Sequence, residues 1–358
     1  MIERFMPYIS IFLLTVCQLT SAQQATPERI PVKVVVLTMF EKGEDVADRP
    51  GEFQNWVEKL PLAQSMPFPQ GYRDLRYSDR GILGVVTGMG IAKAAASTMA
   101  IGLDTRFDLS KAYWIIAGIA GVDPEDASLG SAVWAEWVID GDLSHQIDTR
   151  EVPSAWTTGY IPLRQAEPYE LPVPENNEGA VYRLNADLVE WAYQLTKNVK
   201  LKDNGKIKQQ RELYTDHIKG QVPPFVLKGD HLAASTYWHG ALLNQWANDW
   251  VHYWSEGNGN FVTSGMEDTG TLQSLTFLGN AGKVDINRVL VLRTASNYTV
   301  QYPGITASQS LRETVKGKGY SAYVPALDAA YEVGSVVVNE LVNNWVKYKD
   351  MPPGKVTR

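Results

Sequence analysis

The chain of 358 residues contains a single cysteine, Cys17. One cysteine forms no internal disulfide, so disulfide bonds do not stabilise this protein. Basic charge is also scarce, since 33 Lys and Arg residues stand against 40 Asp and Glu residues, for a formal net charge of -7. Nucleic-acid backbones require a basic face, so this balance argues against a nucleic-acid partner and favours a neutral or mildly polar small ligand.

Long apolar runs and common catalytic motifs are absent as well. Runs such as residues 113–120 have the length of a strand and fall short of the ~20 residues of a membrane-spanning helix. The five histidines are scattered, with no His-x-x-x-His or His-Glu pairing, so no metal site is predicted. No Gly-x-Ser-x-Gly nucleophile elbow occurs. The chain is therefore not expected to be a helical channel or an enzyme of these motif classes.

The first 22 residues have the pattern of a secretory signal peptide. Arg4 precedes a mostly apolar stretch (residues 5–19), and small residues follow at positions 20–22, where a signal peptidase cuts. We therefore expect a mature chain of residues 23–358, free of cysteine, in the periplasm or secreted. An N-terminal membrane anchor is the alternative, which the short apolar run disfavours.

Strand patterns and helical patterns alternate in the mature chain. Residues 32–38 (VKVVVLT) form a nearly continuous β-branched run, which indicates a strand covered on both faces. A second strand (81–87) leads into the turn Gly88-Met89-Gly90 and an alanine-rich helix (91–101). The backbone N–H groups of such a turn can approach an anion, although many such turns only form a tight corner. The candidates for holding phosphate or water here are Thr87, Gly88 and Gly90.

Polar side chains follow the apolar runs of two later segments, residues 261–278 and 289–298. In the first, the acidic pair Glu267-Asp268 begins a helical pattern, and in the second a VLVL run ends in a polar cluster. Ligands of open α/β sheets bind beyond the carboxyl ends of the strands, so both segments are expected to contribute to one site. Glu41 and Glu52 follow the first strand in the same way, with solvated loop carboxylates as the alternative for each.

Aromatic residues gather between positions 237 and 254. Trp246, Trp250 and Trp254 would share one face of a helix, a pattern more typical of core than of a ligand platform. Tyr237 and Trp238 precede Gly240 in a turn and are the better candidates for stacking on an aromatic base. Further expectations are a proline-rich excursion or lid over residues 151–178, a helix over 185–197 with Asn185 as its N-cap, and a last helix over 326–346.

Four segments resemble the purine nucleoside permease family, and they recur in matching order and spacing. They are VTGMGIAKAAAS (86–97), IIAGIAGVDPE (115–125), SGMEDTG (264–270) and LRTASNY (292–298). The family is itself similar to the nucleoside phosphorylase and nucleosidase superfamily. The resemblance covers nearly the whole mature chain and implies an α/β fold, a single-domain three-layer sandwich with a mixed central sheet.

The resemblance also implies roles for particular residues. Met266 and Glu267 match the Met-Glu pair whose carboxylate binds the ribose hydroxyls in the phosphorylases. Ser296 and Asn297 match a Ser-Asp dipeptide whose acid protonates the purine leaving group, but an amide has no titratable proton. Asn297 therefore either hydrogen-bonds N7 and O6 of a 6-oxopurine or impairs catalysis.

Two reactions are implied by the superfamily. The phosphorylases usually hold phosphate with arginines near the glycine turn, and the absence of arginine there puts phosphorolysis in doubt, with inorganic phosphate kept as a possible co-substrate. In the nucleosidases a glutamate after the first strand activates water, and Glu41 lies in about that position. Hydrolysis therefore stays open, and no other cofactor is expected.

Three functions remain in competition at this point. The first is a protein that binds a purine nucleoside and cleaves its N-glycosidic bond through an oxocarbenium-like transition state. The second is an exported nucleoside-binding component of an uptake system in the membrane, without catalysis. The third, a glycan-binding or glycan-cleaving protein, rests on the eleven tryptophans. A homo-oligomer is compatible with each of them.

Overall fold

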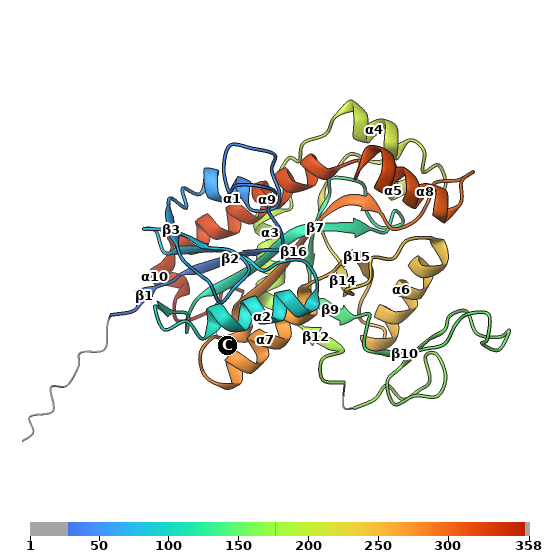
Figure 1. Ribbon diagram of the computed structural model, residues 1–358, viewed down its shortest axis with the longest axis horizontal. Helices are drawn as coiled ribbons and strands as arrows, with labels where there is room; N and C mark the ends of the chain where they lie inside the picture. Colours follow the sequence, from blue (N-terminus) through green and yellow to red (C-terminus); the bar gives the residue numbers. More distant parts are fainter. Residues whose placement is uncertain (1–27, 176, 355–358) are drawn as a thin grey trace, which may run out of the picture.

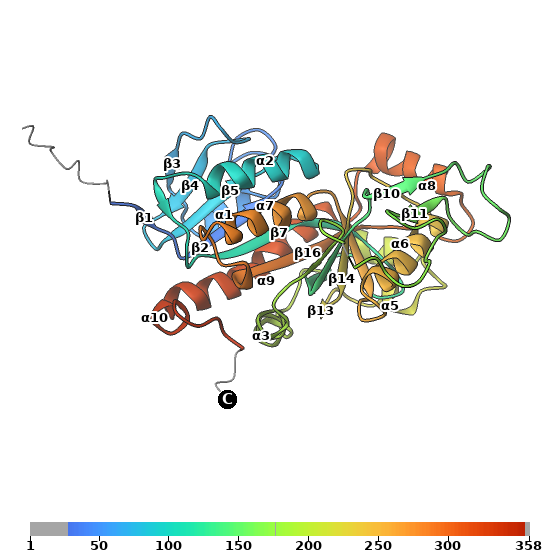
Figure 2. The ribbon, with the colours of Figure 1, turned by 90° about the horizontal axis from the view of Figure 1, so that it is seen from below.

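The structure is a computed structural model that describes residues 28–175 and 177–354. The expected signal peptide, residues 1–22, lies outside the described residues. A large mixed sheet forms the middle layer, and helices cover both of its faces (Figures 1 and 2). The structure therefore confirms the predicted α/β architecture with a mixed central sheet.

The centre of the sheet is formed by long buried strands. Strand β7 (Tyr113–Val122) pairs in parallel with β2 (Val34–Thr38) on one side and with β16 (Val289–Tyr298) on the other. Strand β5 (Ile82–Val86) adds in parallel to β2. Helices cover both faces here, which explains why the sequence is continuously apolar rather than alternating. The apolar run predicted to end at Leu292 continues as a strand to Tyr298, so the polar cluster lies within β16 and not after it.

Shorter strands extend the sheet in both directions. Beyond β5, two antiparallel strands complete one edge, β4 (Leu75–Ser78) and β3 (Gln64–Met66). Strand β15 (Phe261–Gly265) pairs with the carboxyl end of β7 and leads to β14, β9 and β12. The remaining strands are β1 (Ile30–Pro31), β6 (Phe107–Asp108), β8 (Ala132–Ala135), β9 (Trp137–Asp140), β10 (Ser144–Gln146), β11 (Tyr160–Pro162), β12 (Val181–Arg183), β13 (Val226–Lys228) and β14 (Asp230–Ala233).

Two helices pack side by side on one face of the sheet, α2 (Ile91–Gly102) and α7 (Asp268–Asn280) (Figures 1 and 2). Gly270 allows this close approach, since a Cβ atom there would collide with the carbonyl oxygen of Ile91. The opposite face carries α9 (Tyr323–Asn343), with α1 (Gln54–Lys59) and α3 (Ala186–Thr196) in contact with it. The other helical segments are α4 (Gly205–Arg211), α5 (Ile218–Gln221), α6 (Ala241–Trp254), η1 (Ile286–Arg288), α8 (Ala307–Glu313), the π-helical turn η2 (Thr314–Lys318) and α10 (Trp345–Tyr348).

Several local predictions are confirmed. Asn185 caps α3, because its side chain accepts hydrogen bonds from the backbone N–H groups of Asp187 and Leu188. The tryptophans of α6 are buried in a cluster with Phe261, as expected of a core stripe. The last long helix, predicted over residues 326–346, runs from Tyr323 to Asn343; it begins before Pro325 because proline is tolerated in a first turn. Within residues 28–175 and 177–354, no helix has the length and apolar character that a membrane span requires.

Candidate active site

A cavity of about 840 Å³ lies at the carboxyl ends of the central strands. Its wall combines residues after β2, the second half of β7, the junction of β15 with α7, and the carboxyl end of β16. Strands β2, β7 and β16 run parallel, so their carboxyl ends meet at one edge, and β15 joins them there through the end of β7. The two segments predicted to share a site, 261–278 and 289–298, are thereby brought together.

Glu267 connects two elements of this wall. It occupies the N-cap position of α7, and the residue is only 4% exposed. Its Oε1 accepts a hydrogen bond from the backbone N–H of Gly90 at 3.3 Å, and its Oε2 accepts from Arg293 Nη2 at 3.1 Å. Met266 lies beside it on the cavity wall. The predicted ribose pair therefore faces the cavity next to the glycine turn.

Arg293 lies at the centre of a buried charge network. Its Nε donates to Asp268 Oδ1 at 3.2 Å, its Nη2 donates to both Asp268 and Glu267, and its Nη1 donates to the carbonyl of Ile119. Burial raises the pKa of Asp268, but Arg293 and His231 more than offset this, so its pKa lies below the usual range. His231 Nε2 is 2.9 Å from Asp268 Oδ2. The network holds the guanidinium in one orientation at the cavity wall.

Glu52 is a second carboxyl group at the cavity, and it is held differently. Its Oε2 accepts from the backbone N–H of Met39 at 2.8 Å, and its Oε1 accepts from that of Ile119 at 2.7 Å. Glu52 Oε1 and Arg293 Nη1 would each lie 2.7 Å from a Cβ atom on Gly118, so the absent side chain makes room for both groups. Burial raises the pKa of Glu52 to about 8, although Arg293 acts in the opposite direction. A carboxyl group of this kind can exchange a proton near neutral pH.

Glu41 also borders the cavity, but its carboxylate is engaged elsewhere. Its oxygens accept hydrogen bonds from four backbone N–H groups, those of Lys42, Gly51, Phe53 and Gln54. Phe53 at the N-cap of α1 has no polar side-chain atom, so Glu41 supplies the acceptor for that helix end. Glu52 is more deeply buried than Glu41 and has a raised pKa, which makes it a second candidate for proton exchange. The catalytic role of Glu41 stays a prediction.

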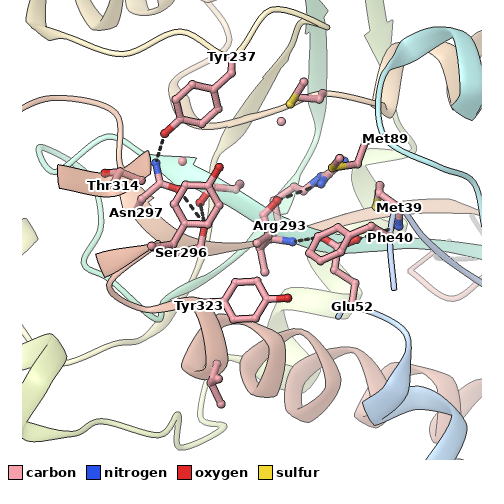
Figure 3. Close-up of a pocket in the computed structure, with 18 of the residues that line it drawn as sticks. Met39, Phe40, Glu52, Met89, Tyr237, Arg293, Ser296, Asn297, Thr314 and Tyr323 are labelled. Carbon is pink, nitrogen blue, oxygen red and sulfur yellow. Dashed lines mark hydrogen bonds between the residues drawn. The ribbon is translucent and has the colours of Figure 1, made fainter. Parts of the chain in front are cut away.

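The other end of the cavity carries an amide and aromatic rings. Figure 3 shows Asn297, Ser296 and Tyr237 at one end of the view and Glu52, Met39 and Met89 at the other, with Arg293 between them. Asn297 Nδ2 donates to the Tyr237 hydroxyl at 3.3 Å, and Asn297 Oδ1 accepts from the Ser296 hydroxyl at 2.8 Å. The Tyr237 ring stacks on that of Tyr320, at 6.3 Å between ring centres. This end is therefore suited to a flat polar ring such as a nucleobase.

Four other predicted site residues, Trp238, Thr87, Gly88 and Gly90, are not among the residues that line the described cavity. Trp238 is buried against Trp246 and Phe261 and does not belong to the described cavity wall, because adjacent side chains in the turn point in different directions. Thr87 is fully buried and donates its hydroxyl hydrogen to the backbone carbonyls of Thr38 and Gly88. At the turn it is Met89 that borders the cavity, while the Gly90 N–H donates to Glu267. The phosphate or water role of Thr87, Gly88 and Gly90 stays a prediction.

The arrangement of a mixed sheet, helices on both faces and a site at the strand ends defines a nucleoside phosphorylase-like fold. The futalosine hydrolase of Helicobacter pylori has a similar fold, with a TM-score of 0.50 and 14% sequence identity over 87% of this chain and 98% of that chain. The family model described as purine nucleoside permease matches residues 31–353, so the chain belongs to the purine nucleoside permease family.

Two fungal relatives support this family assignment. A Schizosaccharomyces pombe protein named "Probable purine nucleoside permease" is 32% identical over 268 residues, 73% of this chain and 76% of that protein. A purine nucleoside permease of Candida albicans is 27% identical over 327 residues, 88% of this chain and 76% of the relative. The resemblance read from the four sequence segments is thereby confirmed.

Proposed function

We propose that the chain binds a purine nucleoside in the cavity and hydrolyses its N-glycosidic bond. The nucleoside is supported by the names of the family and of both fungal relatives. The observation that carries the hydrolytic step is Glu52, a buried carboxyl group with a pKa of about 8 beside a buried arginine.

The proposed chemistry assigns one task to each group. Glu267 accepts hydrogen bonds from the ribose hydroxyls, and Asn297 binds the edge of the base. The ionised form of Glu52 removes a proton from a water molecule, and the water oxygen forms a bond to C1′ as the bond from C1′ to the base breaks. The bonding electrons leave with the base, whose charge the Nδ2–H group of Asn297 stabilises by hydrogen bonding before solvent supplies a proton.

Hydrolysis is favoured over phosphorolysis by the surroundings of the glycine turn. The Gly90 N–H is engaged by Glu267, and the Thr87 hydroxyl is engaged by backbone carbonyls. Two of the groups expected to hold phosphate therefore already have partners. The phosphate route would require those bonds to be broken.

The second candidate is nucleoside binding for uptake without catalysis, and Asn297 is the observation that favours it. An amide cannot protonate the leaving purine, so an important part of the usual rate acceleration is missing. In this case residues 1–22 would export the chain, and a membrane uptake system would receive the nucleoside.

A base-release assay separates the candidates. The chain from residue 23 onward is incubated with inosine, with and without phosphate, and free hypoxanthine is measured. Release in both conditions supports hydrolysis, and release only with phosphate supports phosphorolysis. Inosine binding without release in either condition supports the binding-only candidate.

A further inference from the structure

Three cationic side chains border the cavity, those of Lys42, Arg49 and Lys206. Within residues 28–175 and 177–354, none of these three forms an ion pair with a carboxylate. The chain as a whole is acidic, with a formal net charge of -7, so carboxylates are in excess. Unpaired cations at a cavity in an acidic protein indicate that an anion is supplied from elsewhere.

Lys42 is the clearest case of a cation that lacks a protein counter-charge, because its side chain is half-buried. Its ammonium group lies 4.0 Å from the centre of the Tyr323 ring and 5.9 Å from that of Phe40. Burial, together with the nearby charge of Arg49, lowers the pKa of Lys42, although the Glu41 carboxylate acts in the opposite direction. The carboxylate of the adjacent Glu41 is committed to backbone N–H groups. A ligand anion at this position would offset the cost of desolvating the ammonium group.

The amino-terminal end of α9 lies among the same cations. Tyr323 and Val324 border the cavity, and Lys202 pairs with Asp328 at 3.0 Å, which brings the start of α4 beside the first turn of α9. The N-cap residue, Ala322, has no side-chain acceptor, and the first turn carries no acidic residue. The partial positive charge of the helix end adds to that of the side chains. We call Lys42, Arg49, Lys206 and the first turn of α9 the electropositive wall.

In the proposed position of the nucleoside, one carbon of the ribose, C5′, is not bound by Glu267 or Asn297. Glu267 takes the 2′ and 3′ hydroxyls and Asn297 takes the base, so C5′ is the ribose carbon from which a further group can extend. A cavity of about 840 Å³ lies toward the upper end of the ~300–1,000 Å³ of pockets for drug-sized ligands. The space is therefore generous for a nucleoside without a substituent.

We infer that the cavity accepts a purine nucleoside with an anionic group attached at C5′, such as a 5′-phosphate, and that the electropositive wall is the subsite for this group. The inference rests on the proposed function, because Glu267 and Asn297 define the orientation of the nucleoside. It extends that function by naming a charged substrate class.

Calorimetric titration at low salt compares inosine with inosine 5′-monophosphate. We expect the monophosphate to bind about tenfold more tightly, because charge-assisted hydrogen bonds to the half-buried Lys42 and to the exposed Arg49 and Lys206 add to the nucleoside contacts. Lys42→Gln and Arg49→Gln should each weaken monophosphate binding about threefold to fivefold, with little effect on inosine. Lys283→Gln removes the same charge from an exposed position after α7 and should change neither affinity.

The outcomes distinguish the subsite from the function on which it rests. If inosine binds and the monophosphate binds equally well or more weakly, the subsite is excluded and the proposed function stands. If neither ligand binds, the proposed function fails together with the inference. A third titration uses inorganic phosphate. If free phosphate tightens inosine binding and competes with the monophosphate, the wall holds a separate phosphate ion, and the assignment to C5′ is overturned.

Discussion

The Arg293 guanidinium donates a hydrogen bond to the Glu267 carboxylate, with Nη2 at 3.1 Å from Oε2. Asp268 accepts from Nε and Nη2 of the same guanidinium, and the carbonyl of Ile119 accepts from Nη1. Because these groups are buried, the bonds fix the direction of Glu267 before any ligand arrives. A carboxylate positioned in this way loses little conformational entropy when it binds two neighbouring hydroxyls.

The first prediction concerns Glu267→Gln. A carboxylate makes charge-assisted bonds to two hydroxyls, each worth roughly 1.5–3 kcal/mol, whereas an amide oxygen accepts less strongly. We expect the affinity for inosine to fall about tenfold to a hundredfold, and the affinity for 2′-deoxyinosine to fall much less, because that ligand already lacks one bond. Titration of both ligands on both proteins measures the difference. Equal losses for the two ligands would remove Glu267 from the ribose site and leave it as a cap of α7.

The second prediction concerns the stability of the fold and Glu52. The pKa of this group is raised from 4.5 to about 8, so the protonated form is favoured in the folded state. Its contribution to stability is therefore complete below about pH 4.5 and is lost as the pH rises toward 8. In wild type this group lowers the free energy of unfolding by up to about 1.4 kcal/mol per pH unit in that interval.

Glu52→Gln should remove this part of the pH dependence, since glutamine does not titrate. Urea unfolding between pH 5 and pH 8 measures it, and Glu151→Gln is the matched control at an exposed position. If the wild type and Glu52→Gln lose stability in parallel over this range, Glu52 does not have a raised pKa.

The third prediction concerns Asp268, which forms the buried centre of the charge network. Asp268→Asn would leave Arg293 without its main counter-charge, and breaking a buried ion pair from one side costs about 3–5 kcal/mol. We expect a loss of that size in the free energy of unfolding, together with weaker inosine binding, because Arg293 no longer holds Glu267. Asp148→Asn at an exposed ion pair is the control and should change neither property. Unchanged stability of Asp268→Asn would show that the network contributes little.

The fourth prediction concerns the choice of base at Asn297. The amide of Asn297 can donate to O6 of a 6-oxopurine, whereas an aspartic acid can donate its proton to N7 and accept from the 6-amino group of adenosine. Asn297→Asp should therefore lower the ratio of inosine to adenosine affinity by about tenfold or more. The same change should accelerate base release from adenosine, because a carboxyl group can donate a proton. An unaltered ratio would place the base elsewhere in the cavity.

Much of the fold could be predicted because its signals are local. The β-branched run before Thr38, the alanine-rich helix after Gly90 and the Asn185 cap each depend on a few neighbouring residues. The family resemblance pointed to residues near the strand ends. Six of the predicted site residues line one cavity: Glu41, Tyr237, Met266, Glu267, Ser296 and Asn297.

The rest depends on contacts between residues distant in the sequence. Glu52 reaches the site because the preceding loop folds back, so that its N–H donates to the carbonyl of Phe40 at 3.0 Å. In the sequence, Glu41 is closer than Glu52 to the end of the first long strand at Thr38. His231 meets Asp268 only because β14 and β15 are adjacent in the sheet, and no local pattern indicates that contact. Asp268 and Arg293 can be read from the sequence, but the ion pair between them cannot be predicted from it.

The most direct test of the account follows the oxygen that enters the product. Wild-type protein and Glu52→Gln are incubated with inosine in water enriched in heavy oxygen, without phosphate, and the products are analysed by mass spectrometry. If Glu52 activates water, wild type yields hypoxanthine and ribose with one heavy oxygen at C1, and Glu52→Gln binds inosine but releases no base. Base release by Glu52→Gln at the wild-type rate, or none by wild type saturated with inosine, would contradict the account.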